Sequence, residues 1–182
     1  RRELEEIARH WLAMGVDGFR VDAIQHIIES ETGAIANTPE TYQWVNEFQS
    51  FVNRVAPSAL VVGETWTEMP AIVRYHEAGL DMSFDYPLWR EVLSALQARS
   101  AADLAFTVAQ EQDLYPIDAR RGTFIGNHDQ TRVATLFSLP RRDERRLKLA
   151  ASLLLTLPGT PFIYYGEELG LADGPGGGDL AK

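Results

Sequence analysis

The stretch Ala59–Trp66, ALVVGETW, decides the fold that we expect for this chain. Its first part is a continuous apolar run, which is typical of a strand covered on both faces, as in a parallel sheet. The run ends at an acidic residue, Glu64. Two other stretches have the same form, because GFRVDA leads to Asp22 and FIGNHDQ leads to Asp129. Apolar strands that each end near a carboxylate predict a parallel sheet with acidic side chains at the carboxyl ends of its strands.

Helices and strands alternate along the whole chain. Apolar residues at helical spacing predict helices, and short apolar runs bounded by Gly or Pro predict strands. The expected helices cover residues 4–14, 39–56, the surroundings of 72–73, 88–98, 102–112 and 143–157, and the expected strands cover residues 16–21, 59–63, 80–84, 123–126 and 161–165. No linker or shift in composition marks a domain boundary, so the pattern predicts about five β/α units in one region, 1–182.

This pattern predicts an α/β fold, specifically a partial (β/α)₈ barrel with parallel strands. In such barrels the catalytic groups come from the ends of several strands and share one mouth. A whole barrel needs about 250 residues, whereas this chain has 182. An isolated part would leave strand edges open to water, which natural proteins avoid. We therefore expect the chain to be a fragment of a longer protein or a chain that needs a partner, with the glycine-rich stretch 174–182 as a flexible loop or a cut end.

Composition excludes several classes of function. The chain is 45% hydrophobic and 24% charged, as in ordinary globular proteins. Its 17 basic and 26 acidic residues give a formal charge of −9, which argues against a nucleic acid partner. Cysteine is absent, so neither a disulfide nor a thiolate metal site is expected. No apolar run approaches the roughly 18 residues of a membrane span, and the charged start RRELEEIARHW is not a signal peptide, which leaves the compartment open.

Two of the carboxylates are expected to sit in different surroundings. Side chains alternate across a strand, so Arg20 and Asp22 should share one side and Val21 should face the other. A guanidinium beside Asp22 would keep that carboxylate ionised, as a nucleophile requires. Glu64 follows apolar residues, and an apolar setting favours the protonated form that a general acid needs. Paired carboxyl groups that differ in this way are typical of an acid and a nucleophile.

Other residues near these strand ends are candidates for binding. Asp129 supplies a third carboxylate, and we expect the adjacent His128 to bind substrate. His26 lies one turn beyond Asp22, where it could face the mouth or cap local backbone. Trp66 follows Glu64 closely and is a candidate for stacking on a sugar ring. A single acidic residue at a strand end is most often a helix cap, but three together favour a catalytic site.

A divalent metal site is the alternative interpretation of the acidic residues. Barrel enzymes that bind Mg²⁺ also place carboxylates at strand ends. Arg20 argues against this site, because a fixed positive charge would compete with the cation for the carboxylates. We therefore expect no metal ligands among these residues.

Four stretches resemble the α-amylase family of glycoside hydrolases. GFRVDAIQH looks like the family's strand-four motif, GETW its strand-five motif, GNHD its strand-seven motif and PGTPFIYYGEELG its strand-eight region. They occur in the family's order and cover nearly the whole chain. The resemblance implies the second part of a (β/α)₈ barrel. It also implies retaining hydrolysis of α-glucosidic bonds, with an α-glucan such as starch or a maltooligosaccharide as substrate.

The resemblance also implies roles for individual residues. Asp22 would be the nucleophile, Glu64 the general acid and then base, and Asp129 the stabiliser of the transition state. The resemblance also assigns substrate and charge positioning to three residues: Arg20, His26 and His128. It places no metal, although family members commonly hold calcium near a domain that this chain lacks.

The chain departs from the family pattern in two ways. The strand-three motif, which helps to bind the sugar, is missing, so the 182 residues alone are expected to show little or no activity. Gln25 stands where many starch-degrading members have Lys, which leaves the linkage preference open. DMSFDYPLW favours an α-amylase. Oligo-α-glucosidase, trehalose-forming and transglycosylating members share the same core, and a non-catalytic interaction module is the alternative from another class.

Overall fold

The computed structural model describes residues 1–137 and 143–174. The chain forms two compact units. The first contains Arg1–Tyr86 and Glu111–Arg121, and the second contains Pro87–Gln110 and the chain from Gly122 onward. The glycine-rich stretch 174–182, which we expected to be a flexible loop or a cut end, lies outside the described residues except for Gly174.

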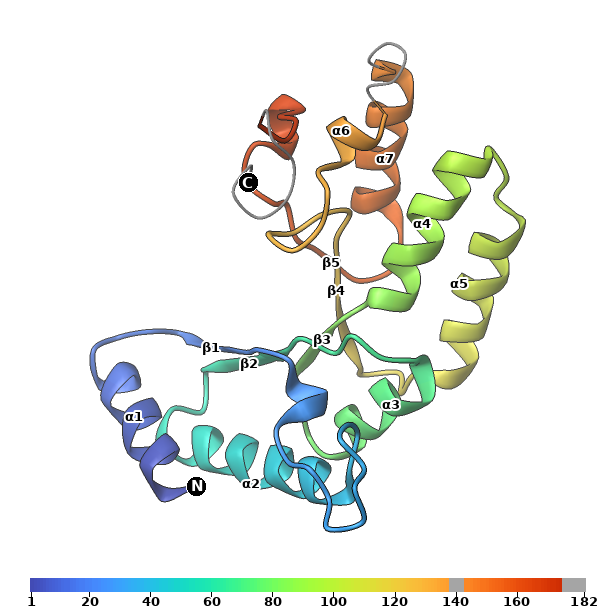
Figure 1. Cartoon of the computed structure of the whole chain (residues 1–182). Helices are drawn as coiled ribbons and strands as arrows, with labels where there is room; N and C mark the ends of the chain where they lie inside the picture. The colour runs from blue at the N-terminus through green and yellow to red at the C-terminus, as the bar shows by residue number, and fades with distance from the viewer. Residues whose placement is uncertain (138–142, 175–182) are drawn as a thin grey trace. The chain divides into compact units, whose positions relative to one another are not determined.

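The first unit is built on three parallel strands. Its elements are α1 (Arg2–Ala13), β1 (Gly18–Val21), the short 3₁₀ helix η1 (Ile24–His26), α2 (Pro39–Val55), β2 (Leu60–Gly63), α3 (Met69–Glu77) and β3 (Met82–Phe84). Gly18 pairs with Leu60 and Val62 pairs with Met82, so β2 lies between β1 and β3. Helices α1, α2 and α3 lie on the same side of these strands (Figure 1).

Local sequence explains where α2 begins and ends. The Thr38 side chain accepts a hydrogen bond from the Thr41 amide at the N-terminus of α2, and Pro39 occupies the first turn, where it sacrifices no helical hydrogen bond. The helix ends at Val55, just before Pro57. The predicted start of this helix is thereby confirmed, and its end lies one residue before the predicted limit at residue 56.

Side-chain alternation on β1 separates its two faces. Phe19 and Val21 pack against a core that contains the fully buried Phe51, Val52 and Val61. Residues that alternate along a strand point to opposite faces. Arg20, between Phe19 and Val21, therefore projects away from this core.

The second unit has its own core. The remaining elements of the chain are α4 (Tyr86–Ala98), α5 (Ala102–Leu114), β4 (Arg120–Thr123), α6 (Val133–Leu136), α7 (Glu144–Thr156), β5 (Thr160–Pro161) and η2 (Glu167–Leu169). β4 pairs with β5 in parallel, with Gly122 opposite Thr160, and the residues of β4 and β5 that pair with each other belong to this unit. The Asp143 side chain caps α7 by accepting a hydrogen bond from the Arg146 amide. The core includes Leu88, Val92, Ile125, Ala150 and Leu154.

Two expected strands differ from the observed ones more than the others do. The strand expected over residues 123–126 is β4 at Arg120–Thr123, and the strand expected over residues 161–165 is β5 at Thr160–Pro161. Phe124 and Ile125 are buried, but they follow the last paired residue of β4. Burial by packing and pairing in a sheet both select apolar residues, so the sequence could not separate them.

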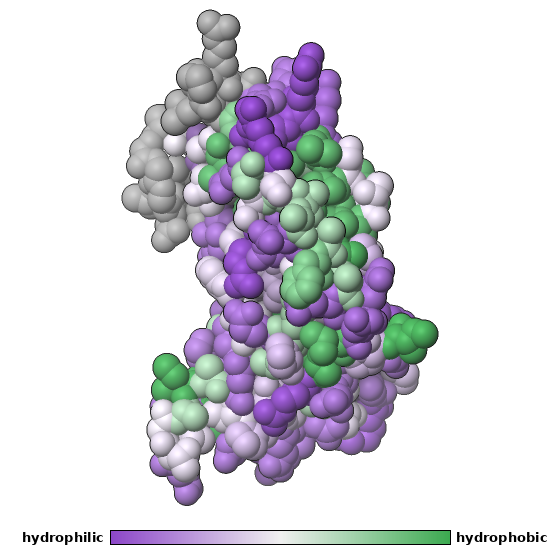
Figure 2. All heavy atoms as spheres, turned by 90° about the vertical axis from the view of Figure 1, so that its right-hand side faces the viewer, coloured by the Kyte–Doolittle hydropathy of each residue, from purple (hydrophilic) through white to green (hydrophobic). Residues whose placement is uncertain are grey.

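The expected fold class is confirmed: in the described part of the chain, five parallel strands alternate with helices. Figure 2 shows a face on which hydrophobic residues form patches among hydrophilic ones. Exposed large apolar side chains in the described residues include Trp11, Phe106, Ile117 and Leu155. Patches of this kind are typical of surfaces that pack against further protein or ligand.

Candidate active site

Asp22 and Glu64 lie side by side at the carboxyl ends of adjacent strands. β1 ends at Val21 and β2 ends at Gly63, and these two residues are partners in the parallel register. The Glu64 amide continues the ladder by donating to the Val21 carbonyl over 2.9 Å. The residues that follow, Asp22 and Glu64, are therefore brought to the same edge of the sheet.

The Arg20 guanidinium joins the two carboxylates. Its Nη1 lies 2.5 Å from Asp22 Oδ1, and its Nη2 lies 3.0 Å from Glu64 Oε1. Hydrogen bonds between ionised partners are shorter and stronger than neutral ones. The contact with Asp22 confirms the prediction that Arg20 and Asp22 share one side of the strand.

The two carboxylates differ in their access to solvent. The Asp22 side chain is 74% exposed, whereas the Glu64 side chain is 8% exposed. A group that attacks a substrate must be reachable, and Asp22 is. The Glu64 side chain is surrounded by protein, and little of it is accessible to solvent.

The apolar setting that we expected for Glu64 is wrong. Its Oε1 accepts a hydrogen bond from the Tyr86 hydroxyl over 3.0 Å as well as the contact with Arg20. Its Oε2 accepts a hydrogen bond from the Ala23 amide over 2.8 Å. The partners come from residues distant in sequence, which explains why the apolar neighbours of Glu64 in the chain were misleading.

Ala23 adopts a left-handed backbone conformation, with φ 42° and ψ 44°. For a residue with a β-carbon this conformation costs about 1–2 kcal/mol. It stands directly after Asp22, and its amide is one of the donors to Glu64. Strained backbone of this kind is typical of functional sites, where the surrounding structure holds it in place.

Trp66 extends the site with an aromatic surface. Its ring stacks on that of Tyr86, with centroids 5.1 Å apart and planes inclined by 7°. Trp66 is 53% exposed, while Tyr86 is buried. One face of the indole therefore packs on protein, and the exposed part of the ring is accessible beside Glu64.

His26 makes a local backbone contact. Its Nδ1 lies 2.8 Å from the Ile35 carbonyl oxygen, which ties η1 to the loop that precedes α2. This is the local contact that we considered as one of two alternatives. In the part of the chain that the structure describes, no hydrogen-bond partner is found for the other ring nitrogen, Nε2.

His128 and Asp129 belong to the second unit, where they lie in the loop after β4. His128 Nε2 lies 3.3 Å from Asp129 Oδ2, and the Asp129 amide donates to Asn127 Oδ1 over 2.8 Å. Both side chains are about half exposed. Direct contacts thus join Arg20, Asp22 and Glu64 in the first unit, and a separate contact joins His128 and Asp129 in the second.

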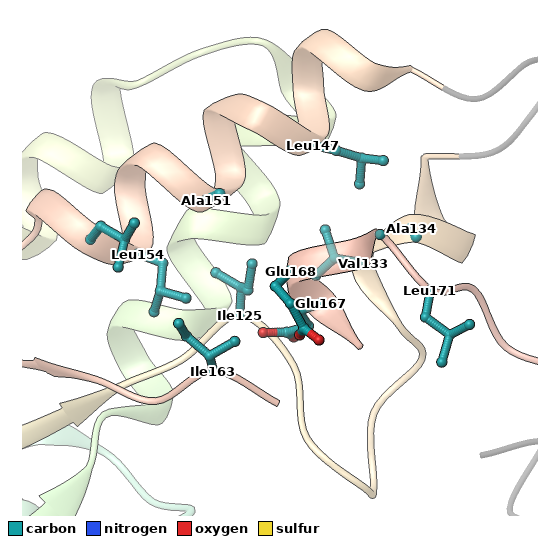
Figure 3. Close-up of a pocket in the computed structure, with 12 residues that line it drawn as sticks. Ile125, Val133, Ala134, Leu147, Ala151, Leu154, Ile163, Glu167, Glu168 and Leu171 are labelled. Atoms are coloured by element: carbon teal, nitrogen blue, oxygen red, sulfur yellow. The ribbon is translucent and has the colours of Figure 1, made fainter. Parts of the chain in front are cut away.

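The second unit also contains an apolar pocket of about 160 Å³ (Figure 3). Its wall is formed by α7, by Ile125 and Val133, and by residues around η2. Burial raises the pKa of Glu167 at its edge to about 7. Few polar groups converge on this pocket, so it does not suit the recognition of a sugar.

The described residues lack two other kinds of site. Within residues 1–137 and 143–174, no group of three or more His, Asp or Glu residues is placed to hold a metal ion. In the same part of the chain, no helix is both long and apolar enough to cross a membrane.

Sequence reasoning missed Tyr86 and the Ala23 amide. Tyr86 follows β3 closely, so its position just after a strand end was a usable signal. Its neutral hydroxyl does not belong to the pattern of acidic residues at strand ends. The role of the Ala23 amide as a donor to Glu64 cannot be predicted from the residue type, because the backbone conformation of residue 23 depends on the tertiary structure.

Comparisons with known proteins agree with the resemblance seen in the motifs. Residues 1–175 match the family model described as "Alpha amylase, catalytic domain". The chain is 36% identical over 174 residues to Alpha-amylase 3 of Dictyoglomus thermophilum, covering 94% of this chain and 33% of that protein. It is 28% identical over 209 residues to a trehalose synthase of Thermus thermophilus, covering 98% of this chain and 22% of that protein.

A solved structure shows the same fold. The crystal structure of an Anoxybacillus α-amylase superimposes with a TM-score of 0.81 and 27% sequence identity, over 95% of this chain and 36% of that one. The structural match is to (β/α)₈ barrel amylases, and the chain covers about a third of them. The chain therefore spans about a third or less of the length of these relatives.

Proposed function

Because the chain belongs to the α-amylase family of glycoside hydrolases, we propose that the protein hydrolyses α-glucosidic bonds in starch-like or maltooligosaccharide substrates with retention of configuration. The family implies an α-glucan substrate. The observation that supports the proposal most directly is the Arg20 guanidinium between an exposed Asp22 and a buried Glu64.

In the first step, the Asp22 carboxylate attacks the anomeric carbon of the sugar. The bond to the glycosidic oxygen breaks, and Glu64 gives its proton to that oxygen as the leaving sugar departs. The product is a glycosyl ester on Asp22, formed through an oxocarbenium-like transition state. The position of Asp22, directly after β1 and exposed, suits this role.

In the second step, Glu64 accepts a proton from a water molecule that attacks the same carbon. The ester bond to Asp22 breaks, and the sugar leaves with its original configuration. Glu64 is then protonated again, and Asp22 is free. Two inversions at one carbon account for the retention.

The other site residues would bind the sugar. Asp129 would stabilise positive charge in the transition state, and His128 would hydrogen-bond to the sugar. His26 would accept a hydrogen bond from a sugar hydroxyl through Nε2, because its Nδ1 donates to the Ile35 carbonyl. Trp66 would stack its exposed face against a sugar ring, since an aromatic ring offers a large apolar surface. Calcium, if the full-length protein binds it, would take most of its ligands from outside this chain, and backbone near His26 could contribute.

Hydrolysis of soluble starch and of maltooligosaccharides by the full-length protein tests this proposal. We expect activity in the wild-type protein and a loss of at least about 10³-fold in Asp22→Asn, because a neutral amide cannot form the glycosyl ester. Retention is checked by following the anomeric form of the first product by NMR. A folded Asp22→Asn variant with wild-type activity would contradict the assignment of the nucleophile.

A second candidate is conversion of maltose to trehalose, favoured by the similarity to the trehalose synthase of Thermus thermophilus. The same covalent intermediate would be attacked by a glucose hydroxyl rather than by water. Incubation with maltose separates the two candidates, because hydrolysis yields glucose alone, whereas the alternative yields trehalose.

A further inference from the structure

Tyr86 holds the carboxyl group of Glu64 at the carboxyl end of the three strands of the first unit. Its hydroxyl donates to Glu64 Oε1 over 3.0 Å. Tyr86 is 4% exposed and begins α4, and its ring is fixed by stacking on Trp66. The position of the hydroxyl is therefore fixed both by the backbone at the start of α4 and by the stacking of the ring on Trp66.

Tyr86 differs chemically from the other two partners of Glu64. A guanidinium and a backbone amide can only donate hydrogen bonds, whereas a phenol can both donate and accept. Arg20 and the Ala23 amide can thus only donate to Glu64, and neither can accept the hydrogen of its protonated carboxyl group. The Tyr86 oxygen can also accept a hydrogen bond from a protonated carboxyl group.

We propose that Tyr86 is a positioning residue that orients Glu64 and stabilises its carboxylate as the proton leaves for the sugar. This inference rests on the proposed role of Glu64 as the acid and base of the reaction. A hydrogen bond to an ionised acceptor is stronger than one to a neutral acceptor. The interaction therefore strengthens as the glycosidic oxygen takes the proton, and such strengthening accelerates the step.

The inference predicts a dependence on the leaving group. A sugar leaving group needs the proton of Glu64, whereas fluoride leaves with little help from an acid. Tyr86→Phe removes the hydroxyl and keeps the ring that stacks on Trp66. We expect kcat/KM for maltooligosaccharides to fall about tenfold, which corresponds to the loss of one hydrogen bond, and kcat/KM for an α-maltooligosyl fluoride to change less than about twofold.

A matched control is available in the same unit. Tyr42 is also buried, and among the described residues its hydroxyl has no hydrogen-bond partner. Tyr42→Phe should therefore leave the ratio of the two kcat/KM values unchanged. Both variants are made in the full-length protein, and the fluoride reaction confirms in each preparation that the site is intact.

The outcomes separate this inference from the proposed function. An equal loss on both substrates would assign Tyr86 a general structural or binding role, and no loss on either would remove it from the reaction. Each of these results overturns the inference while the hydrolase function stands. A wild-type protein that acts on neither substrate, or an Asp22→Asn variant that acts on both, overturns the proposed function and the inference together.

Discussion

At the scale of single residues, Arg20 is the side chain on which the proposed active site depends most, because its guanidinium contacts both carboxylates. A lysine keeps the charge but offers one ammonium in place of a planar fork. We expect Arg20→Lys to lower kcat/KM for maltooligosaccharides by about 10–100-fold, since small displacements of reacting groups are costly.

The control for Arg20 is Arg9, whose guanidinium lies over the Phe51 ring, away from the site. Arg9→Lys should retain wild-type kcat/KM. If Arg20→Lys behaved like Arg9→Lys, the bridge between the carboxylates would have no part in the reaction.

Ala23 permits a test of backbone strain at the same scale. Glycine adopts the left-handed conformation without steric cost, but it loses more entropy on folding than alanine. In Ala23→Gly these effects oppose each other, so we expect the free energy of unfolding to change by less than about 0.5 kcal/mol. Ala71→Gly, inside α3, should destabilise by about 1 kcal/mol. Chemical denaturation of the two variants checks this, and an equal loss would show that Ala23 is not strained.

At the scale of elements, the pairing of β1 with β2 depends on a glycine. A β-carbon on Gly18 would lie 2.0 Å from the Leu60 carbonyl oxygen. Backbone cannot move aside as a flexible side chain can, so Gly18→Ala must push the two strands apart. We expect a loss of about 3 kcal/mol or more in the free energy of unfolding, and a loss of activity because Asp22 and Glu64 follow these strands.

Gly15 serves as the control for Gly18. Its φ is +96°, yet a β-carbon there would meet nothing within 4 Å. Gly15→Ala should therefore cost only the backbone strain of about 1–2 kcal/mol. Thermal melts that show equal losses for both variants would refute the steric explanation.

A buried cluster of three charged side chains connects several elements of the first unit. Arg121 on β4 contacts both Asp85, after β3, and Glu111, near the end of α5. Burial, together with the Asp85 charge, raises the pKa of Glu111 to about 8, although Arg121 acts in the opposite direction. Two carboxylates facing one guanidinium are neutral when they share one proton, which explains the direction of the shift.

This shift predicts how stability depends on pH. The pKa of Glu111 in the folded state lies above its ordinary value of 4.5, so the folded state binds the extra proton. The stabilisation is complete below pH 4.5 and is lost as the pH rises through about 8. In Glu111→Gln, the decrease in unfolding free energy between pH 5 and pH 8.5 should shrink by on the order of 1–3 kcal/mol.

Asp113 provides the control on the same helix, because its side chain is exposed. Asp113→Asn should leave the decrease between the two pH values unchanged. Urea denaturation at pH 5 and pH 8.5 measures all three proteins, and a Glu111→Gln protein with the wild-type pH dependence would exclude Glu111 as its source.

At the scale of the whole molecule, we expect the 182 residues by themselves to hydrolyse starch poorly compared with the full-length protein. The chain corresponds to about a third of its amylase relatives, and large apolar side chains such as Trp11 and Leu155 are exposed. A sugar-binding mouth needs the ends of several strands around it. Starch hydrolysis by equal molar amounts of the two proteins tests this, and equal activity would show that the 182 residues are sufficient.

Much of the fold and part of the candidate site could be predicted from the sequence, because periodicity and the residues at strand ends are local properties. Alternating helical and apolar segments predicted the α/β class, which is confirmed. The sequence also singled out Asp22 and Glu64, which both contact Arg20 in the structure, whereas the place of Asp129 in the site stays a prediction. Local patterns also located the start of α2, where Thr38 and Pro39 act within a few residues. The tertiary structure alone decided which groups surround Glu64, because Arg20, Ala23 and Tyr86 reach it from 22 to 44 residues away in the chain. Hydrogen bonds between residues so far apart in the chain depend on strand register and backbone conformation. Neither can be predicted from the sequence neighbours of a residue.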